Sequence, residues 1–213
     1  MSVCKPFHFT VAIDGPAAAG KGTVANGLAN HFGFAHLDTG MLYRAVGAKV
    51  LLGEDPISAA IELAPSDMNS QTLRSQQVAQ MASKVAVIPQ VRAALLTFQK
   101  NFALQNGGAI LDGRDIGTMI CPAADIKFFI TASPEIRALR RFHELHKNGL
   151  ETSYFTVLRD VKERDERDIT RKEAPLKPAQ DAFIMDTSDL SIETSLKRAI
   201  DITSTALTNV TKI

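Results

Sequence analysis

Five short apolar runs recur along the chain, and segments with a helical spacing of apolar residues separate them. Short apolar runs bounded by turn residues are typical of buried strands, and positions three or four residues apart indicate amphipathic helices. Strands that alternate with helices predict a mainly parallel sheet covered on both faces, an α/β fold. The expected strands span residues 7–13, 34–37, 109–111, 126–130 and 183–185.

The helical segments show where they begin and which side they bury. Pro89 is expected to open one helix, with Val91, Leu95, Phe98 and Phe102 on its buried face. Ser133 is expected to cap a second helix and Ser191 the last one. A short helical piece is expected at residues 58–63, inside an irregular stretch. Ala174-Pro175-Leu176 predicts a firm helix stop.

Composition narrows the class of protein. The chain has 213 residues, is 45% hydrophobic and 22% charged, and carries a formal charge of +1. These values indicate one globular domain and give no bulk electrostatic reason for binding nucleic acid or a membrane. No stretch is apolar and long enough to span a bilayer, and the N-terminus lacks the apolar core of a signal peptide. We expect a cytoplasmic monomer in which Cys4 and Cys121 are free thiols.

The most informative segment lies between the first strand and the first helix. A strand, a glycine-framed loop, a lysine and a helix together form the phosphate-binding loop pattern. Glycines let successive N–H groups point at one spot, and the helix adds the positive end of its dipole. Lys21 is expected to reach the β- and γ-phosphates. The residues are Gly15, Pro16, Ala17, Ala18, Ala19, Gly20, Lys21, Gly22 and Thr23.

Polar residues also follow the second and third strands. Asp38-Thr39 and Arg44 follow the second, and residues 112–117 follow the third. Because ligands bind beyond the carboxyl ends of parallel strands, Thr39 and Arg44 are expected to face a second phosphorylated ligand. Asp112 could hold Mg²⁺ or its waters, and the arginine that follows could grip phosphate. The alternatives are a plain helix cap and an ion pair that ties a turn.

Two further segments are rich in arginine. Arg137, Arg140 and Arg141 form a basic turn, and the two at i and i+4, Arg137 and Arg141, could lean over a nucleotide. Residues 159–171 are dense in both signs, and Arg164, Asp168 and Arg171 fall at i, i+4 and i+7 on one helix face. That face suits a lid over phosphates, with a solvent-facing helix as the alternative. Taken alone, Ser83 and Arg92 are expected at the surface.

Together these motifs resemble cytidylate kinase of the bacterial type. The resemblance covers residues 9–200 approximately, and it is carried by segments 13–23, 37–44, 112–118 and 164–182. It implies an adenylate-kinase-like P-loop NTPase fold. The implied parts are a core (about 1–40, 103–150 and 180–213), a nucleoside monophosphate (NMP)-binding region (about 41–102) and a short lid (about 151–175). Many bacterial members carry a longer, strand-like insert near residues 64–71, so the NMP-binding region is expected to be shortened.

The resemblance also assigns roles. It implies transfer of the γ-phosphoryl group of ATP to CMP or dCMP, with Mg²⁺. Residues 15–23 would bind ATP, and Asp112 would lie near the metal, with Thr23 touching it directly or through water. The implied catalytic residues are Lys21, Arg114, Arg164 and Arg171. The implied CMP-binding residues are Thr39, Arg44, Ser83, Arg92, Arg114, Asp115, Asp168 and Arg171.

Two other functions fit the phosphate loop. One is a kinase of the same architecture that acts on another monophosphate or a small metabolite such as shikimate. The other is a nucleotide switch without turnover. Many arginines around a second ligand site speak against the switch, because a switch needs no acceptor.

Overall fold

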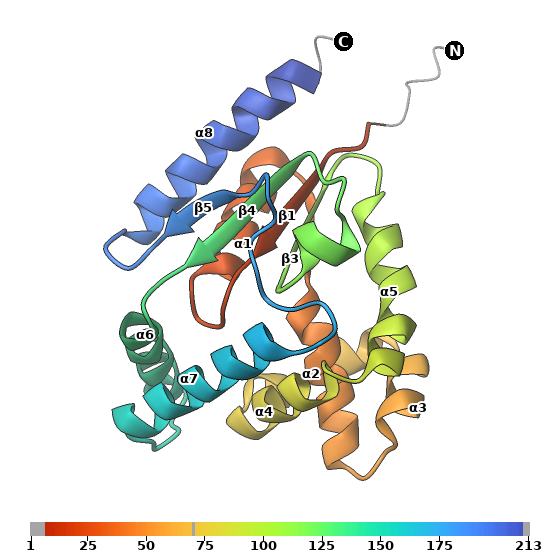
Figure 1. The fold of residues 1–213 in the computed structure, drawn as a ribbon, viewed down its shortest axis with the longest axis vertical. Coiled ribbons are helices and arrows are strands. Elements are labelled where there is room, and N and C mark those ends of the chain that lie inside the picture. Colours follow the sequence, from red (N-terminus) through yellow and green to blue (C-terminus); the bar gives the residue numbers. More distant parts are fainter. Residues whose placement is uncertain (1–6, 70, 211–213) are drawn as a thin grey trace.

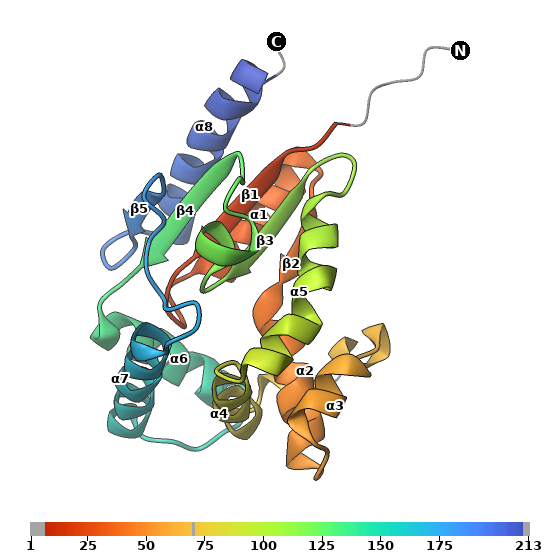
Figure 2. The ribbon, with the colours of Figure 1, turned by 45° about the vertical axis from the view of Figure 1, so that its right-hand side comes forward.

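The computed structural model of the chain describes residues 7–69 and 71–210. Its centre is a five-stranded sheet, all parallel, with strand order β2-β3-β1-β4-β5 (Figures 1 and 2). The expected α/β fold with a parallel sheet is therefore confirmed, with each strand shifted by at most a few residues. The strands are β1 (Thr10–Asp14), β2 (Ala35–Asp38), β3 (Ala109–Gly113), β4 (Ile126–Thr131) and β5 (Phe183–Asp186).

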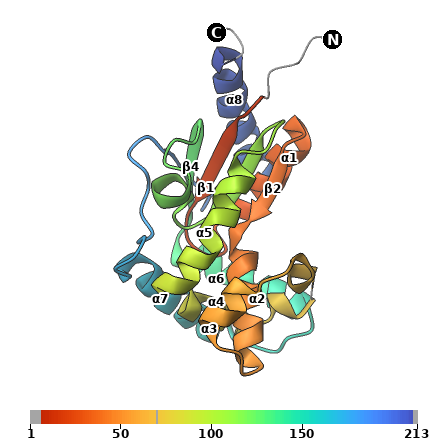
Figure 3. The same ribbon diagram turned by 90° about the vertical axis from the view of Figure 1, so that its right-hand side faces the viewer.

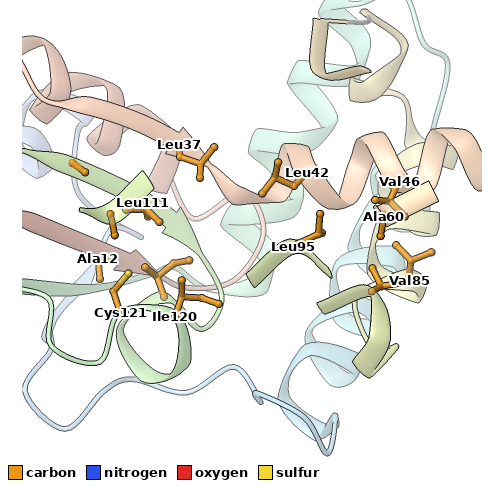
Figure 4. Packing of buried hydrophobic residues seen from close by; sticks show 14 of the residues in the cluster. Ala12, Leu37, Leu42, Val46, Ala60, Val85, Leu95, Leu111, Ile120 and Cys121 are labelled. Atoms are coloured by element: carbon orange, nitrogen blue, oxygen red, sulfur yellow. The ribbon is translucent and has the colours of Figure 1, made fainter. Parts of the chain in front are cut away.

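Helices cover both faces of this sheet. Val11 and Ile13 of β1 pack on the same side as α1 (Lys21–Phe32) and α8 (Ile192–Val210). Ala12, between them, packs in a second cluster with Leu111 and α5 (Pro89–Ala103), part of which Figure 4 shows. The alternation follows from the two-residue period of a strand, and it buries both faces of the sheet.

The remaining helical elements lie beyond the carboxyl ends of the strands or connect the strands to the helices already named. They include two 3₁₀ turns where the shortened stretch was expected, and a single π-helical turn after β3. They are α2 (Thr39–Leu51), α3 (Pro56–Ile61), η1 (Pro65–Asn69), η2 (Gln71–Arg74), α4 (Gln76–Val85), η3 (Ile116–Ile120), α6 (Pro134–Lys147) and α7 (Tyr154–Thr170).

Two helical groups face each other beyond these strand ends. On one side α2 packs against α3 and α4, and on the other α6 packs against α7 (Figures 2 and 3). Contacts between α4 and α7 join the two groups. The Gln76 side chain of α4 donates a 2.5 Å hydrogen bond to Asp160 of α7.

Most of the local expectations hold. Ser133 caps α6 by accepting from the Ile136 N–H, and the Ser191 hydroxyl accepts from the Thr194 N–H at the start of α8. The short helix lies at Pro56–Ile61 rather than 58–63, because Pro56 can take the first helical turn behind the Asp55 cap. Cys121 is a buried free thiol, whereas Cys4 lies outside the described residues.

The expected buried face of α5 is wrong at one position. Val91 and Leu95 are buried, but Phe98 is 46% exposed. The buried stripe continues through Gln99, which is 1% exposed. Its side-chain amide donates to the Leu95 carbonyl, so the polar group is satisfied inside the protein. The apolar pattern alone favoured the phenylalanine over this internally bonded glutamine.

No single helix in the described part of the chain is long and apolar enough to cross a membrane. By length and composition only, α4 and α5 together would be long and apolar enough to cross a membrane, but the two helices are bent by 98° at the break between them.

The contact between α2 and α4 gives a stability prediction. A Cβ on Gly47 would lie 2.9 Å from the backbone nitrogen of Ala82, which cannot move aside. We expect Gly47→Ala to lower the free energy of unfolding by about 1–3 kcal/mol, although alanine favours a helix. Urea unfolding followed by circular dichroism measures this change.

Gly27→Ala is the matched control, since Gly27 is also helical. The three atoms nearest to its Cβ would all belong to the flexible Leu196 side chain, the two methyl carbons at 2.5 and 2.7 Å and Cγ at 3.1 Å. This variant should change stability by less than about 1 kcal/mol, because Leu196 can rotate and the helix gains from alanine. Equal losses in both variants would contradict the packing explanation.

Candidate active site

The loop between β1 and α1 has the backbone that a phosphate cradle needs. Gly15 has φ +145° and Gly20 has φ +96°, while Ala18 is left-handed at φ +59°. A Cβ on Gly15 would lie 1.9 Å from the Ile130 carbonyl oxygen, so only glycine fits between the loop and β4. The loop therefore turns tightly onto the N-terminus of α1, where unpaired N–H groups favour an anion.

Side chains from two other elements hold this loop in place. The Thr187 hydroxyl, after β5, donates to the Ala19 carbonyl at 2.9 Å. Arg137 of α6 donates to the Ala17 carbonyl at 3.3 Å and forms a bidentate ion pair with Asp165 of α7. Arg140 in turn bonds Thr187 through its hydroxyl and its carbonyl. Carbonyl oxygens thus point outward to these donors, which leaves the loop N–H groups for a ligand.

The lysine at the end of the loop is buried. Lys21 is 6% exposed, and its ammonium group donates to the Pro16 carbonyl at 2.7 Å. Burial and the nearby Arg114 guanidinium together lower the pKa of Lys21 to about 7, although Asp112 and Asp38 act in the opposite direction. The negative charges near Lys21 therefore do not fully compensate its buried positive charge, as expected for a group that binds a polyanion.

Two carboxylates lie at the carboxyl ends of β2 and β3. Asp38 pairs with Asp112 in the register of the two strands. Burial raises the pKa of Asp38, and the neighbouring charge of Asp112 raises it further. The Asp112 carboxylate is also 2.8 Å from Nε2 of His36. The sequence pattern indicated Asp112, but it gave Asp38 only the role of a helix cap. Asp38 makes no side-chain capping bond, so its carboxylate stays available.

These carboxylates suit a metal that a nucleotide brings with it. The described residues hold no cluster of three or more metal-ligating side chains. One or two carboxylates beside a phosphate loop are what Mg²⁺ uses when substrate phosphates and water complete its shell. Asp112 and Asp38, with the exposed Thr23 hydroxyl on α1, fit such a shared site.

A network of arginines and carboxylates joins α5, the turn after β3 and the end of α7. Asp115 lies between Arg92 and Arg171, bonding the first closely and the second at 3.2 Å. Asp168 lies 3.0 Å from Arg114 and 3.8 Å from Arg164, and these positive charges hold its pKa below its usual value. Five of the expected acceptor-site residues thus meet in one cluster.

The structure differs from two of the sequence expectations about these residues. Ser83 and Arg92 are not at the surface, since Ser83 is 3% exposed and the Arg92 side chain 12%. The Asp115 carboxylate pairs outside its own turn, with Arg92 and Arg171, so the alternative of an ion pair within the turn is not seen for it. Arg171 lies just after the last residue of α7 rather than on its face, because the chain becomes extended there. Its guanidinium still donates to Asp115, and it also donates to the Ala174 carbonyl.

The other expected acceptor residues have different surroundings. The Thr39 hydroxyl donates to the Asp112 carbonyl at 2.8 Å and so ties the start of α2 to β3. Arg44 donates to the Leu73 carbonyl at 2.7 Å. The Ser83 hydroxyl is buried without a hydrogen-bond partner, a costly state that a ligand could relieve. Tyr43, which the sequence reading did not single out, accepts from Arg92 at 3.4 Å.

A cleft of about 1090 Å³ opens above the phosphate loop. Its lining includes loop residues 17–23, arginines from three helices and the arginine of the turn after β3: Arg44, Arg140, Arg164 and Arg114. Burial and Arg114 lower the pKa of Arg164 to about 9, and its Nε makes no hydrogen bond, although Asp168 lies 3.8 Å away. Arg137 does not line the cleft; it supports the loop instead of leaning over a nucleotide. The cleft is large enough for a nucleotide and strongly cationic.

Comparison with known proteins identifies the family. The family model described as cytidylate kinase matches residues 11–205. The chain belongs to the cytidylate kinase family. It is 56% identical over 194 residues to a cytidylate kinase of Cereibacter sphaeroides, covering 91% of this chain and 94% of the relative. A cytidylate kinase of Methylocella silvestris is 53% identical over 204 residues, covering 92% and 94%.

Solved structures agree on the fold. An uncharacterised protein from Eubacterium ventriosum has a TM-score of 0.57 at 15% identity, covering 92% of this chain and 98% of that one. A gluconokinase from Sinorhizobium meliloti has a TM-score of 0.51 at 12% identity, covering 98% and 99%. At such low identity these likenesses bear on the P-loop kinase fold alone.

The low pKa of Lys21 gives a prediction for ATP binding. Without ATP, Lys21 has a pKa of about 7 and is therefore mostly deprotonated at pH 8. A bound polyphosphate favours the charged form of the side chain. We expect ATP to bind with net proton uptake at pH 8 that approaches one proton, and with little uptake by Lys21 at pH 6. Calorimetric titration in two buffers of different ionisation enthalpy measures the uptake.

Lys21→Met should abolish the uptake at pH 8. Lys84→Met is the matched control, because Lys84 lines the same cleft but is exposed. If wild type and the Lys21 variant take up the same number of protons, Lys21 is not the titrating group.

Proposed function

We propose that this protein transfers the γ-phosphoryl group of ATP to CMP or dCMP, giving ADP and CDP or dCDP. Family membership supports this reaction. One structural observation supports it further. A phosphate loop with a buried lysine faces an arginine-rich cleft, and an arginine–carboxylate cluster lies beside that cleft. A reaction between two polyanions needs such an arrangement, because their repulsion must be cancelled before they can meet.

The donor side would be the loop at residues 15–23. Its N–H groups and the N-terminus of α1 would bind the ATP phosphates, with Lys21 on the transferring group. The outward carbonyls already have donors in Thr187 and Arg137, so the loop is fixed before ATP arrives. A preorganised cradle loses little free energy in rearrangement when the charge moves.

The acceptor side would be formed by residues of α2, α4, α5 and the turn after β3. Arg44 and Arg114 would hold the acceptor phosphate, with Thr39 at the base of the site. The Ser83 hydroxyl, which has no hydrogen-bond partner, would read the base together with Arg92 and Asp115, while Asp168 would contact the sugar. The acceptor phosphate is ionised at neutral pH, so this assignment needs no general base.

Closure would come from the lid, about residues 151–175, over the core and an NMP-binding region at about 41–102. Arg164 and Arg171 of the lid would neutralise charge on the transferring group, and closing it would exclude water that could hydrolyse ATP. Mg²⁺ bound with ATP would neutralise charge on the phosphate oxygens. Asp112 would hold this ion or its waters, with Thr23 as a further ligand.

The other two functions remain alternatives to this proposal. A panel of CMP, dCMP, UMP and AMP, with ADP release as the readout, separates a cytidylate kinase from a kinase of another acceptor. ADP release that does not depend on any acceptor would favour a switch. We further propose a monomer in the cytoplasm, which gel filtration and cell fractionation test.

Loss of the lysine should separate folding from turnover. We expect Lys21→Met to keep the circular dichroism spectrum of wild type. Its kcat should fall by about 10²–10³-fold, since it loses a charge that stabilises the transferring group. Lys84→Met, in the same cleft, should keep kcat within about twofold. A Lys21→Met variant with near-normal turnover would overturn the assignment of the loop.

A further inference from the structure

We propose that Asp14 is a positioning residue that sets the acceptor turn, residues 114–117, against the phosphate loop. This inference rests on the proposed function, because that function places Arg114 and Asp115 at the acceptor. Neither the loop motif nor the arginine clusters include Asp14 among the expected site residues.

The geometry of Asp14 is specific. It is the last residue of β1, directly before Gly15, and it is 3% exposed. One carboxylate oxygen accepts from the Ile116 N–H and the other from the Gly117 N–H, both at 2.7 Å. One side chain thus holds two successive backbone groups of a segment about 100 positions away in the chain.

These two N–H groups belong to the start of the π-helical turn η3. The N-terminal groups of a helical turn have no partner within it and need one from elsewhere. Asp115 occupies the cap position but makes no side-chain capping bond, because its carboxylate pairs with Arg92 and Arg171. Asp14 takes over the capping role. Asp115 is thereby free to face the cluster, and the backbone that carries it is fixed to β1.

The carboxylate is needed in its ionised form for this role. Burial raises the pKa of Asp14 to about 6, although the Gly117 and Ile116 N–H groups oppose the rise. An uncharged side chain of the same shape would offer only one acceptor to the two donors. Replacing the carboxylate by an amide therefore breaks one bond and leaves a buried N–H unpaired, which is costly.

The phosphate loop does not depend on Asp14 in the same way. It is anchored by Thr187 at Ala19, by Arg137 at Ala17 and by the close packing of Gly15 on β4. A change at Asp14 should therefore disturb the acceptor side more than the ATP side. A merely structural role at the end of a strand would weaken both sides alike.

The test is steady-state kinetics of Asp14→Asn, varying CMP and ATP separately. Wild type must first show CMP-dependent ADP release; if it does not, the proposed function fails before any variant is made. In the variant we expect KM for CMP to rise about tenfold or more, with KM for ATP within about twofold. An equal rise in both KM values, or in neither, would overturn the positioning role.

Thr10→Val is the matched control. Thr10 lies at the other end of β1, and its buried hydroxyl donates to the Ala103 carbonyl at 2.9 Å. This variant also loses a buried hydrogen bond of the same strand, far from the turn. It should lower Tm while the ratio of the two KM values stays that of wild type.

A double-mutant cycle tests whether Asp14 acts through Asp115. If it does, Asp14→Asn should raise KM for CMP much less in an Asp115→Ala background than in wild type. Full additivity of the two effects would overturn the proposal.

One measurement remains decisive if Asp14→Asn fails to fold. Amide hydrogen exchange of the wild-type protein should find the Ile116 and Gly117 N–H groups as protected as those of β1, with or without nucleotide. Exchange as fast as that of exposed loops would mean that Asp14 does not hold the turn.

Discussion

The site depends on the pairing of arginine and carboxylate groups where the parallel strands end. Taking such charges out of water is costly unless opposite charges and hydrogen bonds compensate them. Asp115 between Arg92 and Arg171, and Asp168 between Arg114 and Arg164, provide this compensation. The same guanidinium groups suit phosphate. Because each carboxylate has two arginines, it keeps one partner when the other arginine binds a ligand.

This pairing also connects parts of the chain that are distant in sequence. Asp115 follows a central strand, Arg92 lies on α5 and Arg171 follows the last residue of α7. The bond between Gln76 and Asp160 adds a second link between the two helical groups. The two helical groups on either side of the cleft therefore touch each other.

Much of the fold could be predicted from the sequence, because its signals are local. Five apolar runs predicted the five strands. Gly15 and Gly20, which allow backbone angles that other residues rarely adopt, and the positive charge of Lys21 located the phosphate loop. Caps such as Ser133 and Ser191 were equally local. Phe98 and Gln99 are the exception, since a buried glutamine that bonds its own helix leaves no apolar pattern.

The sequence by itself determined the chemistry: a loop for phosphates, carboxylates beside it and several arginines to neutralise charge. Only the tertiary structure decided which partners these residues have. In the structure Arg137 supports the loop, Asp38 lies near Lys21, and Asp14 caps the turn that follows the neighbouring strand, β3. The physical reason is that distance and burial decide which partner a charged side chain pairs with. Both are fixed only when strands far apart in the chain lie side by side.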